Sequence, residues 1–272
     1  MRLLPVLVVV LVLVGCGSAP SPEQAVSDTG AKTADAGTAR VAVGFDGAVE
    51  TSGAFDLEDG TGVLEGNLST PHTIITADAS YERLSDERAM TPITSPKRWL
   101  KWEKSVLTPL VLDPIVDSPA DLLAFLSFAG ETREVGSGEE RGERVTRYSA
   151  VLDLERFLAE IPPADRADFR DVLSEIWPGW AAAAPSVQLA LDAKGRLRRA
   201  DLVLGDGSGE LAFGFFDYGV KVDATAPPAE EVVTWSEYEE LLRKECEALK
   251  KKGLETTKSH CVGGCSAGEG EA

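Results

Sequence analysis

From Ala39 onward the chain consists largely of short runs in which apolar and polar residues alternate, and this pattern most restricts the fold. In the first run, Val41, Val43 and Phe45 share one side of an extended segment, while Arg40 and Asp46 lie on the other. Such a period of two is typical of a strand with one buried face. About eleven runs of this kind follow one another, at 39–46, 55–57, 63–68, 73–77, 81–84, 98–103, 132–135, 144–152, 187–191, 197–204 and 211–218. Because turn residues separate them at hairpin spacing, the sequence predicts an antiparallel meander.

Three predicted helices interrupt the strands in two blocks. Ser118 can cap the first helix, and Pro119 suits its first position. Its apolar residues occupy nearly the whole circumference, which predicts a helix that is buried on most sides or lies between a sheet and an apolar space. The second helix covers 153–161, and the third carries an i, i+3, i+4, i+7, i+8 apolar pattern from Phe169 to Trp177. A Gly-rich charged turn is predicted at 136–142, before the strand at 144–152.

Composition indicates a globular and strongly acidic protein. Apolar residues make up 43% of the chain, with five Trp and nine Phe, which is enough for a hydrophobic core in one large β-rich domain or two small ones. The formal net charge is −18. Such a surface repels phosphate backbones and anionic headgroups, so nucleic acid is not an expected partner.

The first sixteen residues have the layout of a secretory signal. Arg2 supplies a positive charge, Leu3 to Val14 form an apolar run, and Gly15 precedes Cys16. The run is too short to span a bilayer, which needs about 20 apolar residues. The sequence Leu-Val-Gly-Cys resembles a bacterial lipobox, which implies cleavage after residue 15 and acylation of Cys16. We therefore expect a lipid-anchored protein on the extracytoplasmic face of the cell membrane. The alternative is an ordinary signal peptide with a chance cysteine.

Residues 16–38 are predicted to be the lipidated cysteine and a flexible tether. The segment from Gly17 to Thr38 is small and polar, and Val26 is its only large apolar residue. Such a segment buries too little surface to offset the entropy of ordering it.

The C-terminal part departs from the strand pattern. Pro227-Pro228 precedes the end of a domain predicted to span 39–233, and Thr234 with Glu237 forms a capping box for a helix over 234–253. One side of this helix is apolar, and it carries Trp235, Tyr238, Leu241, Leu242, Cys246 and Leu249. We expect this side to dock on the domain or on another protein, and docking on the domain is favoured. Residues 254–272 are expected to be a loose tail.

Three cysteines lie in this C-terminal part. Cys246, Cys261 and Cys265, together with His260, offer zinc-type ligands. In an oxidising compartment a disulfide among the three cysteines is the favoured interpretation. One thiol then remains, so a disulfide-linked dimer is a second expected outcome.

Catalytic motifs are weak throughout. A Gly-x-Ser-x-Gly string occurs at 264–268, but a nucleophile elbow needs a strand before it and a helix after it. His72, one of two histidines, is expected to be an ordinary loop residue. The sequence therefore predicts a protein that is not an enzyme, with no cofactor and no bound metal.

Several blocks of the chain resemble a known family. "DSPADLLAFLSFAGE", "VGSGEERGERVTRYSAVLDL", "LALDAKGRLRRADLVL" and "FGFFDYGVKVDATAPPAEEV" look like successive blocks of actinobacterial LppX/LprG-type lipoproteins, which are similar in fold to the LolA and LolB carriers. The resemblance covers about residues 38–233. It implies an α+β fold in which a curved antiparallel half-barrel of about eleven strands has helices on its concave side, with an apolar cavity between them that takes acyl chains.

The resemblance leads to a functional hypothesis, in which the chain binds or carries a lipid or other acylated molecule. The candidate cavity residues are those on the apolar faces of the predicted helices and strands, namely Leu122, Phe125, Leu126, Phe157, Phe169, Leu173, Trp177, Leu189, Leu202 and Phe213. The alternative is a non-catalytic envelope interaction module, in which all ten side chains fill an ordinary core and no ligand binds.

Overall fold

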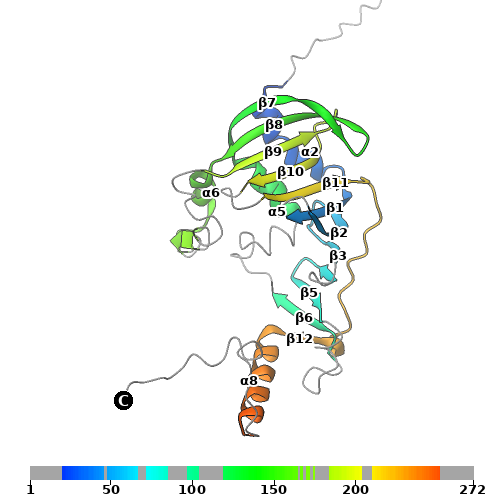
Figure 1. Cartoon of the computed structure of the whole chain (residues 1–272), viewed down its shortest axis with the longest axis vertical. Coiled ribbons are helices and arrows are strands. Elements are labelled where there is room, and N and C mark those ends of the chain that lie inside the picture. Colours follow the sequence, from blue (N-terminus) through cyan, green and yellow to red (C-terminus); the bar gives the residue numbers. More distant parts are fainter. Residues whose placement is uncertain are drawn as a thin grey trace, which may run out of the picture.

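A single curved sheet of twelve strands organises the chain in the computed structural model (Figure 1). The structure describes residues 20–45, 48–66, 72–84, 97–103, 119–164, 166–167, 170–171, 174, 184–203 and 210–251. The strand order is β12-β6-β5-β4-β3-β2-β1-β11-β10-β9-β8-β7, so β12 and β7 form the two edges of an open sheet. Every neighbouring pair is antiparallel except β12 and β6, which are parallel.

The strands are β1 (Thr38–Phe45), β2 (Ala48–Asp56), β3 (Gly62–Gly66), β4 (Thr73–Ile75), β5 (Ala79–Arg83), β6 (Trp99–Glu103), β7 (Ala129–Glu140), β8 (Glu143–Leu152), β9 (Ser186–Leu191), β10 (Leu197–Val203), β11 (Glu210–Phe216) and β12 (Val232–Thr234). The helices are α1 (Pro22–Ser27), α2 (Thr29–Ala34), α5 (Pro119–Phe125), η2 (Leu126–Phe128), α6 (Leu154–Glu160), η3 (Ala229–Glu231) and α8 (Trp235–Lys251). The predicted fold class, an antiparallel half-barrel with helices, is confirmed. The twelfth strand, β12, has no alternating pattern long enough to reveal it.

One face of the sheet carries the main hydrophobic core. Alternate residues of the central strands, such as Val41, Leu202 and Phe213, are buried there. The apolar sides of α1, α5, η2 and α6 pack onto the same face. The helices thus lie inside the curve of the sheet, where Figure 1 shows α2 and α5 beneath the arch of β7 to β11.

The flexible tether predicted for residues 16–38 is wrong for residues 22–34, which form α1 and α2. Val26 is fully buried in the main core. Thr33 is also fully buried, and its Oγ1 accepts a hydrogen bond of 2.9 Å from the backbone N–H of Leu197. Thr29 Oγ1 donates to the carbonyl oxygen of Gly195 at 2.9 Å. The composition of residues 17–38 does not reveal these helices, because the hydrogen-bond partners of Thr29 and Thr33 lie in and next to the β9–β10 turn, far away in the sequence.

A glycine allows α2 to approach α5 closely. A Cβ placed on Gly30 would lie 2.5 Å from the carbonyl oxygen of Leu123, which is well inside van der Waals contact. Any larger residue at position 30 would therefore force the two helices apart.

The turn predicted at 136–142 is shorter than expected. β7 and β8 continue through the Gly-rich stretch, and only Arg141 and Gly142 separate them. Both have positive φ, 48° and 82°, as a two-residue type I′ hairpin requires. The result is a long β7–β8 hairpin that extends beyond β9.

The C-terminal helix begins and docks as the sequence predicts. Glu237 accepts a hydrogen bond from the Thr234 N–H at 2.9 Å, which completes the capping box with Thr234 Oγ1. Its side chains join a second, smaller core formed by Leu84, Leu100, Val233 and Tyr238, with Leu241 and Leu242 against it. The Trp102 and Trp235 rings stack with centroids 4.4 Å apart, joining β6 to α8. Within the described ranges, no helix has the length and apolar character needed to cross a membrane.

Candidate functional site

Seven of the ten candidate cavity residues come together on the helix-covered face of the sheet. Phe157 is partly buried, and the other six are 0% to 5% exposed within one hydrophobic cluster, namely Leu122, Phe125, Leu126, Leu189, Leu202 and Phe213. The cluster joins α5, η2 and α6 to β9, β10 and β11. The sequence thus identified residues that share one apolar interior, and these six side chains are packed together as core.

Three aromatic rings form a cluster at the junction of α5, η2 and α6. Phe157 lies edge-on to Phe125, with centroids 5.3 Å apart, and edge-on to Phe128 at 5.1 Å. Arg156 donates to the carbonyl oxygen of Ser127, and its guanidinium carbon lies 5.3 Å from the centroid of Phe128. The backbone N–H of Asp153 donates to Phe128 O at 2.9 Å. A few polar contacts and one aromatic cluster therefore hold α6 against η2.

The remaining predicted site residues lie outside the described part. These are Cys16, Phe169, Leu173, Trp177, Cys261 and Cys265. Residues 166–167, 170–171 and 174 are helical, within or next to the predicted third helix. Arg170 forms an ion pair of 2.9 Å with Glu155, so this segment contacts α6.

Cys246 lies on α8 and is 8% exposed. Since Cys261 and Cys265 lie outside the described residues, the disulfide among the three cysteines stays a prediction.

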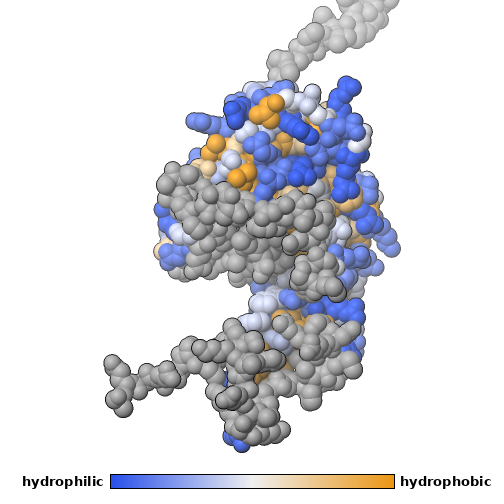
Figure 2. Space-filling model, in the orientation of Figure 1, coloured by the Kyte–Doolittle hydropathy of each residue, from blue (hydrophilic) through white to orange (hydrophobic). Residues whose placement is uncertain are grey.

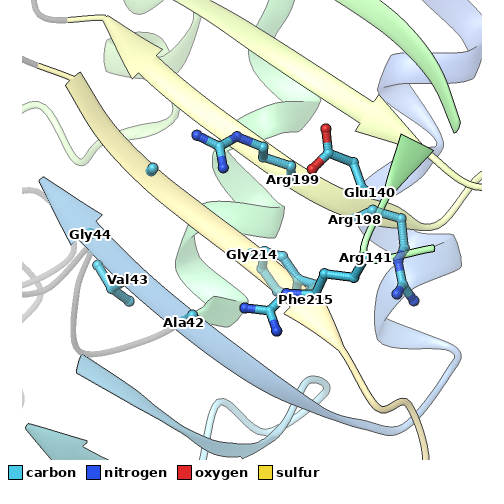
Figure 3. A pocket seen from close by; sticks show the side chains of 10 residues that line it. Ala42, Val43, Gly44, Glu140, Arg141, Arg198, Arg199, Gly214 and Phe215 are labelled. Carbon is cyan, nitrogen blue, oxygen red and sulfur yellow. The ribbon is translucent and has the colours of Figure 1, made fainter. Parts of the chain in front are cut away.

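Hollows of the protein surface lie beside the β7–β8 hairpin. One, of about 510 Å³, is bordered by Arg147, Tyr148, Arg199 and Asp201, and also by the candidate residue Leu189. A small one at the hairpin tip has Glu140, Arg141, Arg198 and Arg199 around it (Figure 3). The sequence pointed to no site here, because the charged residues come from three separate strands and the hairpin tip.

The Asp-x-x-Gly-Arg sequence at 192–196 forms a tightly bonded turn between β9 and β10. Asp192 Oδ1 accepts from the N–H groups of Lys194 and Arg196 at 2.8 and 3.0 Å, and Oδ2 accepts from Arg196 Nε at 2.7 Å. Burial on its own raises the pKa of Asp192, but these hydrogen bonds together hold it below the ordinary value of 3.8. The carboxylate is therefore charged and structural at neutral pH.

Tyr218 lies against this turn, and its hydroxyl donates to the carbonyl oxygen of Leu197. Burial raises the pKa of the Tyr218 phenol, so it remains a neutral donor.

Among the residues that the structure describes, no group of three or more His, Cys, Asp or Glu side chains is arranged to hold a metal ion. The face with the strongest convergence of predicted site residues is apolar, which suits a hydrophobic ligand or a packed core.

Solved structures of lipoproteins are similar to the curved antiparallel half-barrel of this chain, at low sequence identity. Lipoprotein LppX from Mycobacterium tuberculosis is 16% identical and has a TM-score of 0.45, the alignment covering 74% of this chain and 98% of that one. LprF from Mycobacterium bovis is 13% identical with a TM-score of 0.45, over 78% of this chain and 99% of its own.

A putative outer membrane lipoprotein-sorting protein domain from Vibrio parahaemolyticus is 10% identical with a TM-score of 0.29, over 74% and 94% of the two chains. No family model and no curated protein sequence matches the chain.

Proposed function

We propose that this chain is an extracytoplasmic lipoprotein, anchored through Cys16, that holds an acyl chain of a lipid between the sheet and the helices α5, η2 and α6. The observation that carries the proposal is the convergence of the candidate side chains of three helical elements and three strands in one apolar cluster. The lipobox-like sequence before Cys16 supports the anchor.

The proposed entry for the acyl chain is the junction between α6 and η2. α6 is short, and it contacts η2 through the rings of Phe157 and Phe128 and through the hydrogen bond from Arg156 to Ser127 O. Separation of these contacts exposes the apolar face of α5 and of the sheet beneath it. Transfer from a membrane is close to neutral, because a lipid regains in an apolar interior most of the roughly 0.8 kcal/mol per CH₂ that the bilayer supplied.

Native mass spectrometry tests the proposal. It compares protein that was purified without removal of lipid with a delipidated sample. A lipid-sized mass increase in the first sample, lost in the second, is the expected result. Phe157→Ala should accelerate exchange of a fluorescent fatty-acyl lipid. Val151→Ala is the matched control, because it shortens an apolar side chain that is 37% exposed on β8.

A second candidate function is an envelope interaction module with a filled core. The observation that favours it is the packing of six candidate side chains at 5% exposure or less. A single lipid-free mass in both samples, with no uptake of the fluorescent lipid, would support this module and contradict the lipid-binding proposal.

A further inference from the structure

Guanidinium groups gather beside the β7–β8 hairpin. Arg141 from the hairpin tip, together with Arg196 and Arg198 from the start of β10, borders an open hollow of about 500 Å³. The rings of Phe216 and Tyr218, at the end of β11, border it too. We refer to this site as the outer hollow. Figure 2 shows that hydrophilic residues predominate on the visible surface around the hairpin.

Arg198 is buried and only partly satisfied. The pairing of β10 with β9 shifts between Leu197 and Arg199, so Arg198 occupies an irregular position of the kind that redirects a side chain. It is 6% exposed, and its Nη1 lies 3.3 Å from Glu143 Oε2. Its buried Nε has no hydrogen-bond partner in the described part of the chain. An unpaired buried donor is costly, and more so when it is charged, so an acceptor at this position would stabilise the site.

Arg141 supplies the surplus positive charge. Its guanidinium carbon lies 3.9 Å from the centroid of the Phe216 ring, and no carboxylate among the described residues is within ion-pair distance of it. The other guanidiniums that border the hollow are paired, Arg196 with Asp192 at 2.7 Å and Arg198 with Glu143. Asp217, which also borders it, is paired with Arg40 at 3.7 Å. A chain with a net charge of −18 thus has a local excess of one positive charge here.

Backbone strain is found at the same place. The non-glycine residues with positive φ in the described part are Arg141 at 48° and Asp217 at 49°, and both border the outer hollow. Strained residues of this kind often occur at ligand sites, where the surrounding structure holds them in position.

We propose that the outer hollow binds a phosphoryl group, through the guanidinium groups of Arg198 and Arg141. A phosphate monoester carries about −1.5 to −2 charges at neutral pH and accepts parallel N–H donors from arginine. It competes well with Glu143, whose side chain is 50% exposed and whose ion pair at 3.3 Å is correspondingly weak. The phosphoryl group belongs either to a soluble molecule or to a lipid headgroup.

The test is titration of inorganic phosphate into the full-length protein in detergent, followed by isothermal calorimetry. Saturable binding is expected, weakened roughly tenfold or more by Arg141→Gln, since a charge-assisted hydrogen bond is lost. Arg144→Gln is the matched control. Arg144 lies on the same hairpin, where it pairs with Glu139 near the tip, but it does not border the hollow. Glu143→Gln should strengthen binding, because the competing carboxylate is removed.

Arg141→Gln is the main test variant. Arg198→Gln removes a buried charge, so it is used as a second variant only if its unfolding transition matches that of the wild type. Absence of saturable binding, or equal losses from Arg141→Gln and Arg144→Gln, would overturn the proposal.

The source of the phosphoryl group is distinguished with vesicles. Flotation with phosphatidylcholine vesicles containing phosphatidic acid, reduced by Arg141→Gln but not by Arg144→Gln, identifies a headgroup. Phosphate binding without vesicle binding beyond that to pure phosphatidylcholine identifies a soluble phosphate. This result is distinguishable from lipid uptake, because none of the residues proposed to contact the acyl chain borders the outer hollow.

Discussion

The guanidinium carbon of Arg196 lies 4.3 Å from the centroid of the Tyr218 ring, which joins the β9–β10 turn to the end of β11. Both residues belong to sequence blocks that carry the resemblance to LppX/LprG-type lipoproteins. The contact shows that these two blocks form one structural unit. Thr33 of α2 bonds to Leu197 within the same unit, so the N-terminal helices are fastened to it.

Tyr218→Phe should lower the free energy of unfolding by about 1 to 2 kcal/mol, because the carbonyl oxygen of Leu197 loses its donor while the ring remains. Urea denaturation measures the change. Tyr148→Phe is the control and should alter stability little, because the Tyr148 hydroxyl makes no hydrogen bond within the described residues. Equal effects of the two variants would show that the hydroxyl of Tyr218 is not structural.

Asp192→Asn should destabilise the fold by about 1 to 2 kcal/mol at pH 7, because charge-assisted hydrogen bonds to Arg196 are lost. The pKa of Asp192 is lower in the folded protein than its ordinary value of 3.8, so its carboxylate stabilises the fold above that value. This stability disappears as the pH falls through the folded pKa.

The difference in stability between the wild type and Asp192→Asn should therefore shrink from pH 5 to pH 2, as denaturant titrations at each pH would show. Asp223→Asn, at an exposed position, serves as the control. A difference that is independent of pH over this range would contradict the assignment.

The sequence predicts the parts of this fold that depend on neighbours in the chain. Eleven strands follow from alternation, because each step along a strand reverses the side chain. The capping box of α8 follows in the same way, since Thr234 and Glu237 are three positions apart.

The N-terminal helices were missed because their support is distant in sequence. Thr29 bonds to Gly195, 166 positions away, and nothing in the composition of residues 17–38 reveals that partner. The outer hollow was missed for the same reason, since Arg141 and Arg198 meet only through the hairpin and the sheet. Whether apolar residues such as Leu126 and Phe213 line a space or fill it depends on packing, which a periodic pattern does not encode.

Thr33→Val tests whether residues 22–34 are part of the folded domain. The change keeps the shape of the side chain but removes the acceptor of the Leu197 N–H and the donor to Thr29 O. A loss of about 1 to 3 kcal/mol is expected, because a buried N–H is left unpaired. Thermal denaturation provides the measurement, and Thr225→Val at an exposed site provides the control. A loss of stability no larger than that of Thr225→Val would indicate that residues 22–34 are a flexible tether.

A disulfide among Cys246, Cys261 and Cys265 is expected to stabilise the end of α8. A bridge from Cys246 to Cys261 closes about 16 residues and contributes on the order of 3 kcal/mol in the loop-entropy model. Alkylation and mass spectrometry of unreduced protein should find one free thiol in a monomer, or none in a reducible dimer. Three free thiols would rule out the disulfide, and stoichiometric zinc in that sample would favour a metal site instead.

Cys16→Ala should abolish acylation and move the protein from the membrane to the soluble or unprocessed fraction. The position of α1 limits how far the domain of the wild type can lie from the membrane, because α1 begins at Pro22. Six peptide steps from Cys16 to Pro22 span at most about 20 Å, so we expect an anchor at Cys16 to hold the α1 and β7 end of the domain close to the bilayer. Fractionation with a carbonate wash and the mass of the N-terminal peptide measure the outcome. Cys246→Ser, which leaves the lipobox intact, should remain in the membrane fraction. Retention of Cys16→Ala on carbonate-washed membranes would refute the anchor.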